Sequence, residues 1–267
     1  MEKKELRKQK EAEFHDKIRN ENLRTDIKKY EYLTSNKKFY SISRESKNFV
    51  INWLLEQKEG KKILDYCCGN GDFSILLAKN GANVTGIDIS GTSIQNAKNA
   101  ASKEGPSAKV AFFVMDAEKT SFSDNYFDLI VCLGVLHHLN TSSAFKELSR
   151  ILKPDGKIIC DEPLVYNPIF QLYRKITPHL RTNWEADHVL SKRDLNISRQ
   201  YFNKIETRFF HLFVLGAVPF RNLPVFNPLL KMLEKIDSAV LKLPFLKWLS
   251  WQIIFILSKP NKLENEN

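Results

Sequence analysis

The stretch ILDYCCGNGDFSILLAKNGANVTGIDIS, residues 63–90, carries the clearest structural pattern in this 267-residue sequence. An apolar run typical of a strand leads into two glycines, Gly69 and Gly71, and a helical pattern follows them. A second apolar run then ends at an acid, Asp88. Strand, glycine turn, helix and strand in this order predict a βαβ unit with two parallel strands.

Apolar runs and helical segments continue to alternate after residue 90. This alternation predicts an α/β fold, in which a mainly parallel sheet is covered by helices on both faces. The helical segment SAFKELSRILK is expected to end at Pro154 and Gly156, and the segment SILLAKN is expected to end at Gly81. The strand candidates are 62–66, 83–88, 110–116, 127–133, 157–162, 204–214 and 251–258.

The two ends of the chain favour helices. Residues 1–44 are expected to form an N-terminal helical arm, and 45–260 the main domain. Asn167-Pro168 and Asn227-Pro228 each predict a helix start, with asparagine as the N-cap and proline at the first helical position. They place helical insertions after the fifth strand and between the sixth and seventh, with segments 163–203 and 216–248 as candidate lids.

Composition limits the class of protein. The chain is 43% hydrophobic and has a net charge of +10, and its basic surplus lies in the two flanks rather than in the centre. The charged N-terminus lacks the apolar core of a secretory signal, and no apolar run reaches the length of a membrane-spanning helix. Four cysteines without C-x-x-C spacing predict reduced thiols in a cytoplasmic protein.

The glycine turn and the acid at the second strand end predict a nucleotide-like ligand. A carboxylate at Asp88 can accept hydrogen bonds from both hydroxyls of a ribose, while the helix after Gly71 presents free N–H groups. A dinucleotide site would need a third glycine where this chain has Ser74. Asp65, just before the turn, would repel a pyrophosphate but attract a cationic amino group.

These features resemble class I S-adenosylmethionine-dependent methyltransferases of the small-molecule or lipid type (methyltransferase type 11-like), over roughly residues 45–260. The supporting stretches are VMDAEKTSFSDNYFDLIVCLGVLHHL (114–139) and ELSRILKPDGKIICDEP (147–163). The resemblance implies a Rossmann-like seven-stranded sheet of order 3-2-1-4-5-7-6 with an antiparallel seventh strand. It also implies S-adenosyl-L-methionine as the cofactor and S-adenosyl-L-homocysteine as its product.

The resemblance assigns the turn to the methionine part of this cofactor, which Asp65, Gly69 and Gly71 would surround. One residue departs from the family pattern, because Cys67 stands where a glycine is usual. The backbone at Cys67 must tolerate a Cβ, so its φ is negative or some strain is accepted.

The resemblance assigns the rest of the cofactor to three later segments. Asp88 would bind the ribose hydroxyls, and Asp116 with the backbone of Ala117 would face the adenine. Leu133, at the end of the fourth strand candidate, completes the expected cofactor site.

The catalytic candidates lie after the fourth and fifth strands. His137, His138 or Tyr166 could take a proton from a phenol or alcohol if the reaction needs a general base. The alternatives are that the histidines anchor the next helix and that Glu162 and Tyr166 shape the entrance of the site. No metal is expected, because the fourth strand ends without the acid that metal-dependent methylation requires.

The acceptor is expected to be a small, apolar or lipid-like metabolite methylated at oxygen. LGVLHH replaces the Asn/Asp-Pro-Pro-aromatic motif of amino-base methylation, and Cys160 follows isoleucine rather than the proline common in cytosine methylation. The apolar face of 226–243 either packs on the sheet, covers a substrate pocket or lies on an anionic membrane surface at the inner side of the cell. Two alternatives remain open: an RNA methyltransferase, and a non-catalytic module that keeps the cofactor fold.

Overall fold

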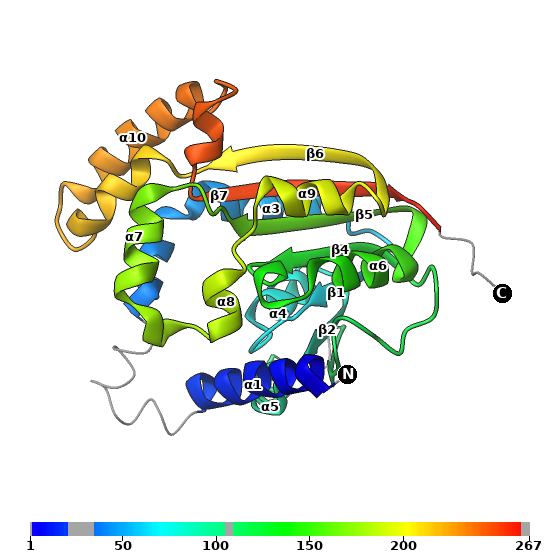
Figure 1. The fold of residues 1–267 in the computed structure, drawn as a ribbon. Helices are drawn as coiled ribbons and strands as arrows, with labels where there is room; N and C mark the ends of the chain where they lie inside the picture. Colours follow the sequence, from blue (N-terminus) through cyan, green and yellow to red (C-terminus); the bar gives the residue numbers. More distant parts are fainter. Residues whose placement is uncertain (1, 21–34, 105–108, 263–267) are drawn as a thin grey trace.

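Seven strands form one sheet in the computed structural model, which describes residues 2–20, 35–104 and 109–262 (Figure 1). Their order, β3-β2-β1-β4-β5-β7-β6, confirms the order that the family resemblance implies. Only β7 runs antiparallel to both of its neighbours, β5 and β6. The strands are β1 (Lys62–Tyr66), β2 (Asn83–Asp88), β3 (Val110–Val114), β4 (Phe127–Leu133), β5 (Leu152–Pro163), β6 (Phe202–Phe210) and β7 (Gln252–Pro260).

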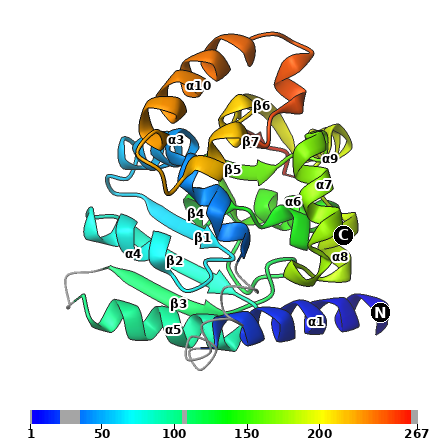
Figure 2. The ribbon, with the colours of Figure 1, turned by 90° about the vertical axis from the view of Figure 1, so that its left-hand side faces the viewer.

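Helices cover both faces of the sheet (Figure 2). One face carries α3 (Arg44–Leu55), α4 (Asp72–Lys79) and α5 (Gly91–Ser102), and the other carries α6 (Thr141–Ile151) and α9 (Lys192–Ser198). Successive side chains of β5 alternate between the two cores: Ile158 and Cys160 pack with α6, whereas Ile159 packs with α3 and α4. All four cysteines are free thiols.

The N-terminal helix α1 (Glu2–Arg19) packs along α5 and crosses the edge of the sheet where β2 ends (Figure 1). The 3-10 helix η2 (Ser35–Ile42) then leads into α3. The predicted helical arm therefore covers the carboxyl ends of the strands, apart from residues 21–34, which lie outside the described part of the chain.

The predicted insertions follow β5 and β6. The first contains α7 (Pro168–Ile176), η4 (Pro178–Leu180), α8 (Asn183–Asp187) and α9; the second contains η5 (Phe213–Phe220), α10 (Phe226–Val240) and η6 (Leu246–Leu249). Helix α10 stacks on η5 and not on the sheet, so the first of the three alternatives for its apolar face is wrong. None of the described helices has both the length and the apolar character needed to cross a bilayer.

Several predicted boundaries are wrong, and three of them affect the second insertion or β5. Asn167 caps α7 as expected, but α10 begins at Phe226, so Asn227 lies inside its first turn, where Pro228 still needs no N–H partner. β6 ends at Phe210 rather than at residue 214, because the left-handed φ of +68° at His211 turns the chain into η5.

The third boundary concerns the end of α6. The helix stops at Ile151, and β5 begins at once with Leu152, which pairs with Phe127 of β4. The residues between Leu152 and Lys157 form an irregularity in this pairing. Pro154 and Gly156 therefore mark a bulge in a strand and not the end of a helix.

Candidate functional site

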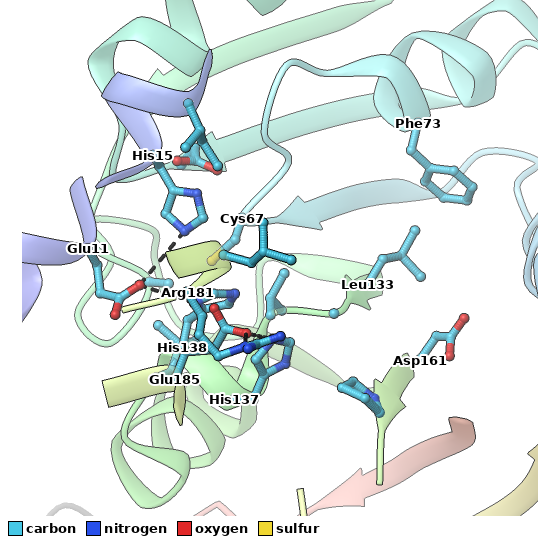
Figure 3. A pocket seen from close by; sticks show the side chains of 18 of the residues that line it. Glu11, His15, Cys67, Phe73, Leu133, His137, His138, Asp161, Arg181 and Glu185 are labelled. Atoms are coloured by element: carbon cyan, nitrogen blue, oxygen red, sulfur yellow. Dashed lines mark hydrogen bonds and ion pairs between the residues drawn. The ribbon is translucent and has the colours of Figure 1, made fainter. Parts of the chain in front are cut away.

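A cavity of about 670 Å³ lies where the strands end, between α1, η2, α7 and the carboxyl ends of β1, β2, β4 and β5 (Figure 3). This volume lies in the range of small-molecule sites. Five predicted cofactor residues line it, namely Cys67, Asp88, Asp116, Ala117 and Leu133. Both predicted histidines line it as well.

The glycine turn keeps a left-handed backbone at three positions. Cys67 has a φ of +61°, and Gly69 and Gly71 have φ values of +58° and +77°. The sequence left open whether Cys67 has a negative φ or accepts strain, and the structure answers with a positive φ, which costs a side-chain-bearing residue free energy. The turn is tied to the sheet through the Cys68 N–H, which donates to the carbonyl of Ile87.

Asp88 is held firmly at the end of β2. Its Oδ1 accepts from the Ser90 N–H and its Oδ2 accepts from the Gly69 N–H, both at 2.9 Å. Arg19 of α1 also reaches Oδ2, at 3.3 Å. The two backbone bonds fix the carboxylate, so that it remains oriented toward the cavity that it lines.

Asp116 is paired with Lys8, a second basic residue of α1. Lys8 Nζ lies 2.6 Å from Asp116 Oδ2, and this contact outweighs burial and raises the pKa of Lys8. Ala117 lies beside it, and its carbonyl accepts from the hydroxyl of Tyr66. The two carboxylates predicted to hold the ribose and to face the adenine are thus both covered by basic side chains of α1.

Three residues predicted at the methionine part are not brought to the cavity wall. Asp65 points to the α4 side of β1, where Ser74 Oγ donates to it at 2.5 Å, and burial raises its pKa to about 6. The space beside Gly69 is filled by the guanidinium of Arg19, and Gly71 faces side chains of the α5 layer. The predicted contact of these three residues with the methionine part of the cofactor therefore stays a prediction.

The two histidines of η3 (Leu136–His138) have different partners. His137 Nδ1 lies 2.7 Å from an oxygen of the fully buried Glu162, whose other oxygen accepts from the N–H groups of Val135 and Leu136 at 2.7 Å each. Glu162 therefore lies beneath η3 and anchors it, rather than shaping the entrance. His137 Nε2 lies 4.0 Å from Glu185 of α8, across the cavity wall.

His138 pairs instead with Glu11 of α1, with 3.1 Å between Nδ1 and Oε2. Burial disfavours its imidazolium, but this hydrogen bond and the surrounding carboxylates outweigh burial and raise the pKa of His138. Tyr166, the third predicted catalytic residue, does not line the cavity. Its hydroxyl accepts from the Lys192 N–H and its ring packs against Trp248.

Asp161 is a site residue that the sequence analysis missed. It lines the cavity next to Glu162 in β5, it is 8% exposed, and its Oδ1 has no hydrogen-bond partner among the described residues. Burial, reinforced by the charge of Glu162, raises the pKa of Asp161 to about 7. Asp161 is thus a carboxyl group able to accept or release a proton near neutral pH.

The far end of the cavity is mainly apolar. Its wall is built by aromatic and aliphatic side chains from η2, α7, η4 and the residue just before β7: Phe39, Phe170, Tyr173, Leu180 and Trp251. One continuous space therefore joins a polar end at Asp88 and Asp116 to an apolar end, with His137 and Asp161 also in its wall. Such a site can hold a nucleoside at one end and an apolar molecule at the other.

Comparisons with known proteins agree with this geometry. Residues 64–160 match the family model described as a methyltransferase domain (Methyltransf_11). Demethylmenaquinone methyltransferase of Staphylococcus aureus is 34% identical over 127 residues, which cover 44% of this chain and 52% of that protein. This chain therefore matches about half the length of that curated relative.

Two solved structures share the fold at low identity. Phosphoethanolamine N-methyltransferase 2 of Haemonchus contortus, in complex with S-adenosyl-L-methionine, is 19% identical with a TM-score of 0.56, over 81% of this chain and 53% of that one. Geranyl diphosphate C-methyltransferase of Streptomyces coelicolor is 14% identical with a TM-score of 0.56, over 80% and 79%. Residues 64–160 thus match a methyltransferase domain, and the chain shares its fold with two solved methyltransferases.

Proposed function

We propose that this protein transfers a methyl group from S-adenosylmethionine to the oxygen of a small, apolar or lipid-like acceptor. The observation that carries the proposal is the single cavity that joins the fixed Asp88 carboxylate to an aromatic wall. The match to a demethylmenaquinone methyltransferase supports a small-molecule acceptor.

The cofactor would bind with its ribose at Asp88 and its adenine near Asp116. Each Asp88 oxygen accepts one backbone N–H, which leaves a lone pair on each for a ribose hydroxyl once Arg19 moves from Oδ2. Lys8 would move from Asp116 in the same way. Cofactor binding therefore requires these two basic side chains of α1 to move.

Methyl transfer is an in-line displacement. The acceptor oxygen forms a bond to the methyl carbon while the carbon–sulfur bond breaks, and its electron pair returns to sulfur, which becomes a neutral thioether. The protein has to align the two molecules and exclude water. A hydroxyl acceptor must also lose a proton, which requires a base at the cavity wall.

His137 is the base that the geometry favours. His137 Nδ1 lies 2.7 Å from Glu162 Oε2, so in the tautomer that donates from Nδ1 to Glu162, Nε2 presents a lone pair that can take the proton of the acceptor. His138 is the weaker candidate, because its Nδ1 is already bound to Glu11. Tyr166 lies outside the cavity lining and is not assigned a catalytic role.

The test is incubation of the purified chain with methyl-labelled S-adenosylmethionine and a host extract, followed by separation into lipid, water-soluble and RNA fractions. Label in the lipid fraction supports the proposal, and mass spectrometry then identifies the product. Label in RNA would favour the RNA methyltransferase alternative. Cofactor binding without transfer to any fraction would favour the non-catalytic module.

Two variants then separate catalysis from binding once the product is known. His137→Ala should lower kcat by about 100-fold or more, the scale of general-base catalysis, while the cofactor Kd stays unchanged. Tyr166→Phe, which removes a hydroxyl outside the cavity, is the matched control and should leave kcat unchanged. An equal kcat in the two variants would contradict the role of His137.

A peripheral membrane contact is the second part of the proposal. The η5–α10–η6 surface exposes a group of large apolar side chains: Phe220, Leu223, Met232, Leu243 and Phe245, of which Phe245 is 87% exposed. The same surface exposes Arg221, Lys231, Lys235 and Lys242. Large apolar side chains among free cations suit an interface with anionic lipid.

The acids of this surface do not cancel its positive charge. Glu234 is bound by Arg44, and the buried Asp237 accepts the backbone N–H groups of Leu212 and Phe213. On the side facing the body of the protein, η5 and α10 belong to one apolar cluster with Phe39 and Trp251 of the cavity wall. The proposed membrane face thus lies next to the apolar end of the cavity.

Vesicle flotation tests this contact. The chain should float with vesicles of phosphatidylcholine and phosphatidylglycerol, and less with phosphatidylcholine alone or at high salt, because salt screens the lysines. Phe245→Asp should abolish flotation, whereas Phe113→Asp, at an exposed phenylalanine of β3, should not. Equal loss in both variants, or no flotation of the parent chain, would contradict a specific membrane face.

A further inference from the structure

Three cavity-lining side chains with metal-ligand chemistry meet between α1 and η3 (Figure 3). Glu11 and His15 lie four residues apart on one face of α1, and His138 comes from the facing η3. Glu11 Oε2 lies 3.1 Å from His138 Nδ1 and 3.8 Å from His15 Nε2. The two imidazole centroids are 5.1 Å apart.

These spacings match those around a metal ion. Bonds of about 2.0 to 2.1 Å in a tetrahedral zinc site place neighbouring ligand atoms about 3.3 Å apart. The two measured separations from Glu11 Oε2, 3.1 and 3.8 Å, lie on either side of this value. Small side-chain adjustments would therefore bring all three atoms to one ion.

We propose that Glu11, His15 and His138 bind one divalent transition-metal ion of the zinc type. Two imidazoles and a carboxylate are a usual donor set for such an ion, and three protein ligands leave the fourth position open. All three residues line the cavity, so an acceptor oxygen or a water molecule in that cavity can take the fourth position.

The surroundings support a built site. Thr182 donates a hydrogen bond to Glu11 Oε1, which orients the carboxylate and leaves Oε2 for the ion. The nearby cations Arg7 and Arg19 are paired with their own acids and do not occupy the cluster.

A simple ion pair between Glu11 and His138 explains only two of the three residues. His15 Nδ1 is buried without a hydrogen-bond partner among the described residues, and Nε2 lies 3.8 Å from Glu11 Oε2, beyond hydrogen-bond distance. A metal ion gives His15 a bonding partner. It also ties α1 to η3, so that the helix stays closed over the cavity.

This proposal departs from the sequence expectation of no metal. That expectation considered only acids at the ends of the fourth and fifth strands, whereas two of the three ligands here come from α1. The proposed site also stands independently of the cofactor, because none of its ligands touches Asp88 or Asp116 through a hydrogen bond or ion pair among the described contacts.

The test is metal titration of the full chain after chelator treatment, without S-adenosylmethionine. One equivalent of Zn²⁺ should bind and raise Tm, and Co²⁺ should give the strong visible absorption of a tetrahedral site. His15→Ala and Glu11→Gln should each weaken Zn²⁺ binding at least about tenfold. His188→Ala, at an exposed histidine stacked on Trp184 outside the cavity, is the control and should bind as the parent does.

Circular dichroism of the metal-free variants shows whether they fold, and Glu11→Gln keeps the size of the side chain if His15→Ala does not fold. No stoichiometric binding by the parent chain would overturn the proposal. Binding that persists unchanged in both ligand variants would overturn it too. A separate titration with S-adenosylmethionine tests the cofactor, so failure of the metal site does not count as failure of the proposed function.

Discussion

The substitution Gly71→Ala tests whether Gly71 is needed for packing of the turn or for cofactor binding. The family resemblance placed it around the methionine part of the cofactor, whereas in the structure it is not among the residues that line the cavity. A Cβ at Gly71 would lie 2.7 Å from Phe112 Cζ and 2.8 Å from Ala97 Cβ, and its φ is +77°. Gly71→Ala therefore combines a backbone cost with a packing cost.

The magnitude follows from these two terms. A left-handed alanine costs about 1 to 2 kcal/mol, and overpacking against Phe112 and Ala97 costs about 1 to 3 kcal/mol more. Gly81 has a φ of +88° but no heavy atom within 4 Å of its Cβ position, so Gly81→Ala isolates the backbone cost. Gly71→Ala should thus lose about 1 to 3 kcal/mol more free energy of unfolding than Gly81→Ala.

Urea unfolding followed by tryptophan fluorescence measures both losses. Calorimetric titration of the folded variants with S-adenosylmethionine should give the same Kd within about threefold, or about 0.6 kcal/mol. If Gly71→Ala is no less stable than Gly81→Ala but no longer binds the cofactor, the packing explanation is refuted and the sequence interpretation stands.

Three further predictions concern the cavity wall. Because the pKa of Asp161 is raised from 3.8 to about 7, the folded chain binds more protons than the unfolded chain between these values, and its free energy of unfolding falls as the pH rises through this window. Urea unfolding of Asp161→Asn at about pH 5 and about pH 8 should lack this fall, and an equal fall in both chains would contradict the assignment. Glu162→Ala should lose about 3 to 5 kcal/mol in the same assay, because His137 and two backbone N–H groups lose a buried acceptor. The exposed Glu59→Ala, its control, should stay within about 0.5 kcal/mol, and similar losses in the two variants would count against the anchoring role. Cys67→Gly should leave the free energy of unfolding unchanged or raise it by up to about 1 kcal/mol, since glycine adopts the φ of +61° without a Cβ; a clear loss would show that no strain is stored there.

Local patterns were sufficient to predict a mainly parallel sheet, and the family resemblance supplied its strand order. Alternating strand and helix segments, together with the family resemblance, led to the order β3-β2-β1-β4-β5-β7-β6. The acid at Asp88 could be assigned because it ends a strand, and the ends of parallel strands meet at one edge of a sheet. The boundary between β6 and η5 could not be assigned, because it depends on the positive φ of His211.

The position of helix α1 over the cavity could not be predicted from the sequence. Helix α1 has no apolar face of the kind that periodicity analysis detects, and it was predicted from its helix-forming residues without an indication of which side faces the protein. Lys8, Glu11, His15 and Arg19 recur at three- and four-residue spacing and therefore share one face, which the structure turns toward the cavity. Their partners are far away in sequence, so only the tertiary structure reveals them.

Which of the adjacent acids Asp161 and Glu162 faces the cavity also depends on the fold. Glu162 was named as a candidate and Asp161 was not, although the two are adjacent in β5. Side chains alternate along a strand, so Glu162 lies on the side of η3, whereas Asp161 lines the cavity. If the pairing of β5 in the sheet had been known, the alternation of its side chains would have shown which of the two acids faces the cavity.

The most direct test of the central claim is calorimetric titration of S-adenosylmethionine into the parent chain and into Asp88→Asn. The parent should bind one equivalent, and the variant should bind about 10- to 100-fold more weakly, because hydrogen bonds to a charged group contribute about 1.5 to 3 kcal/mol. Equal affinity in the two chains, or binding of a nicotinamide dinucleotide in place of S-adenosylmethionine, would contradict the account.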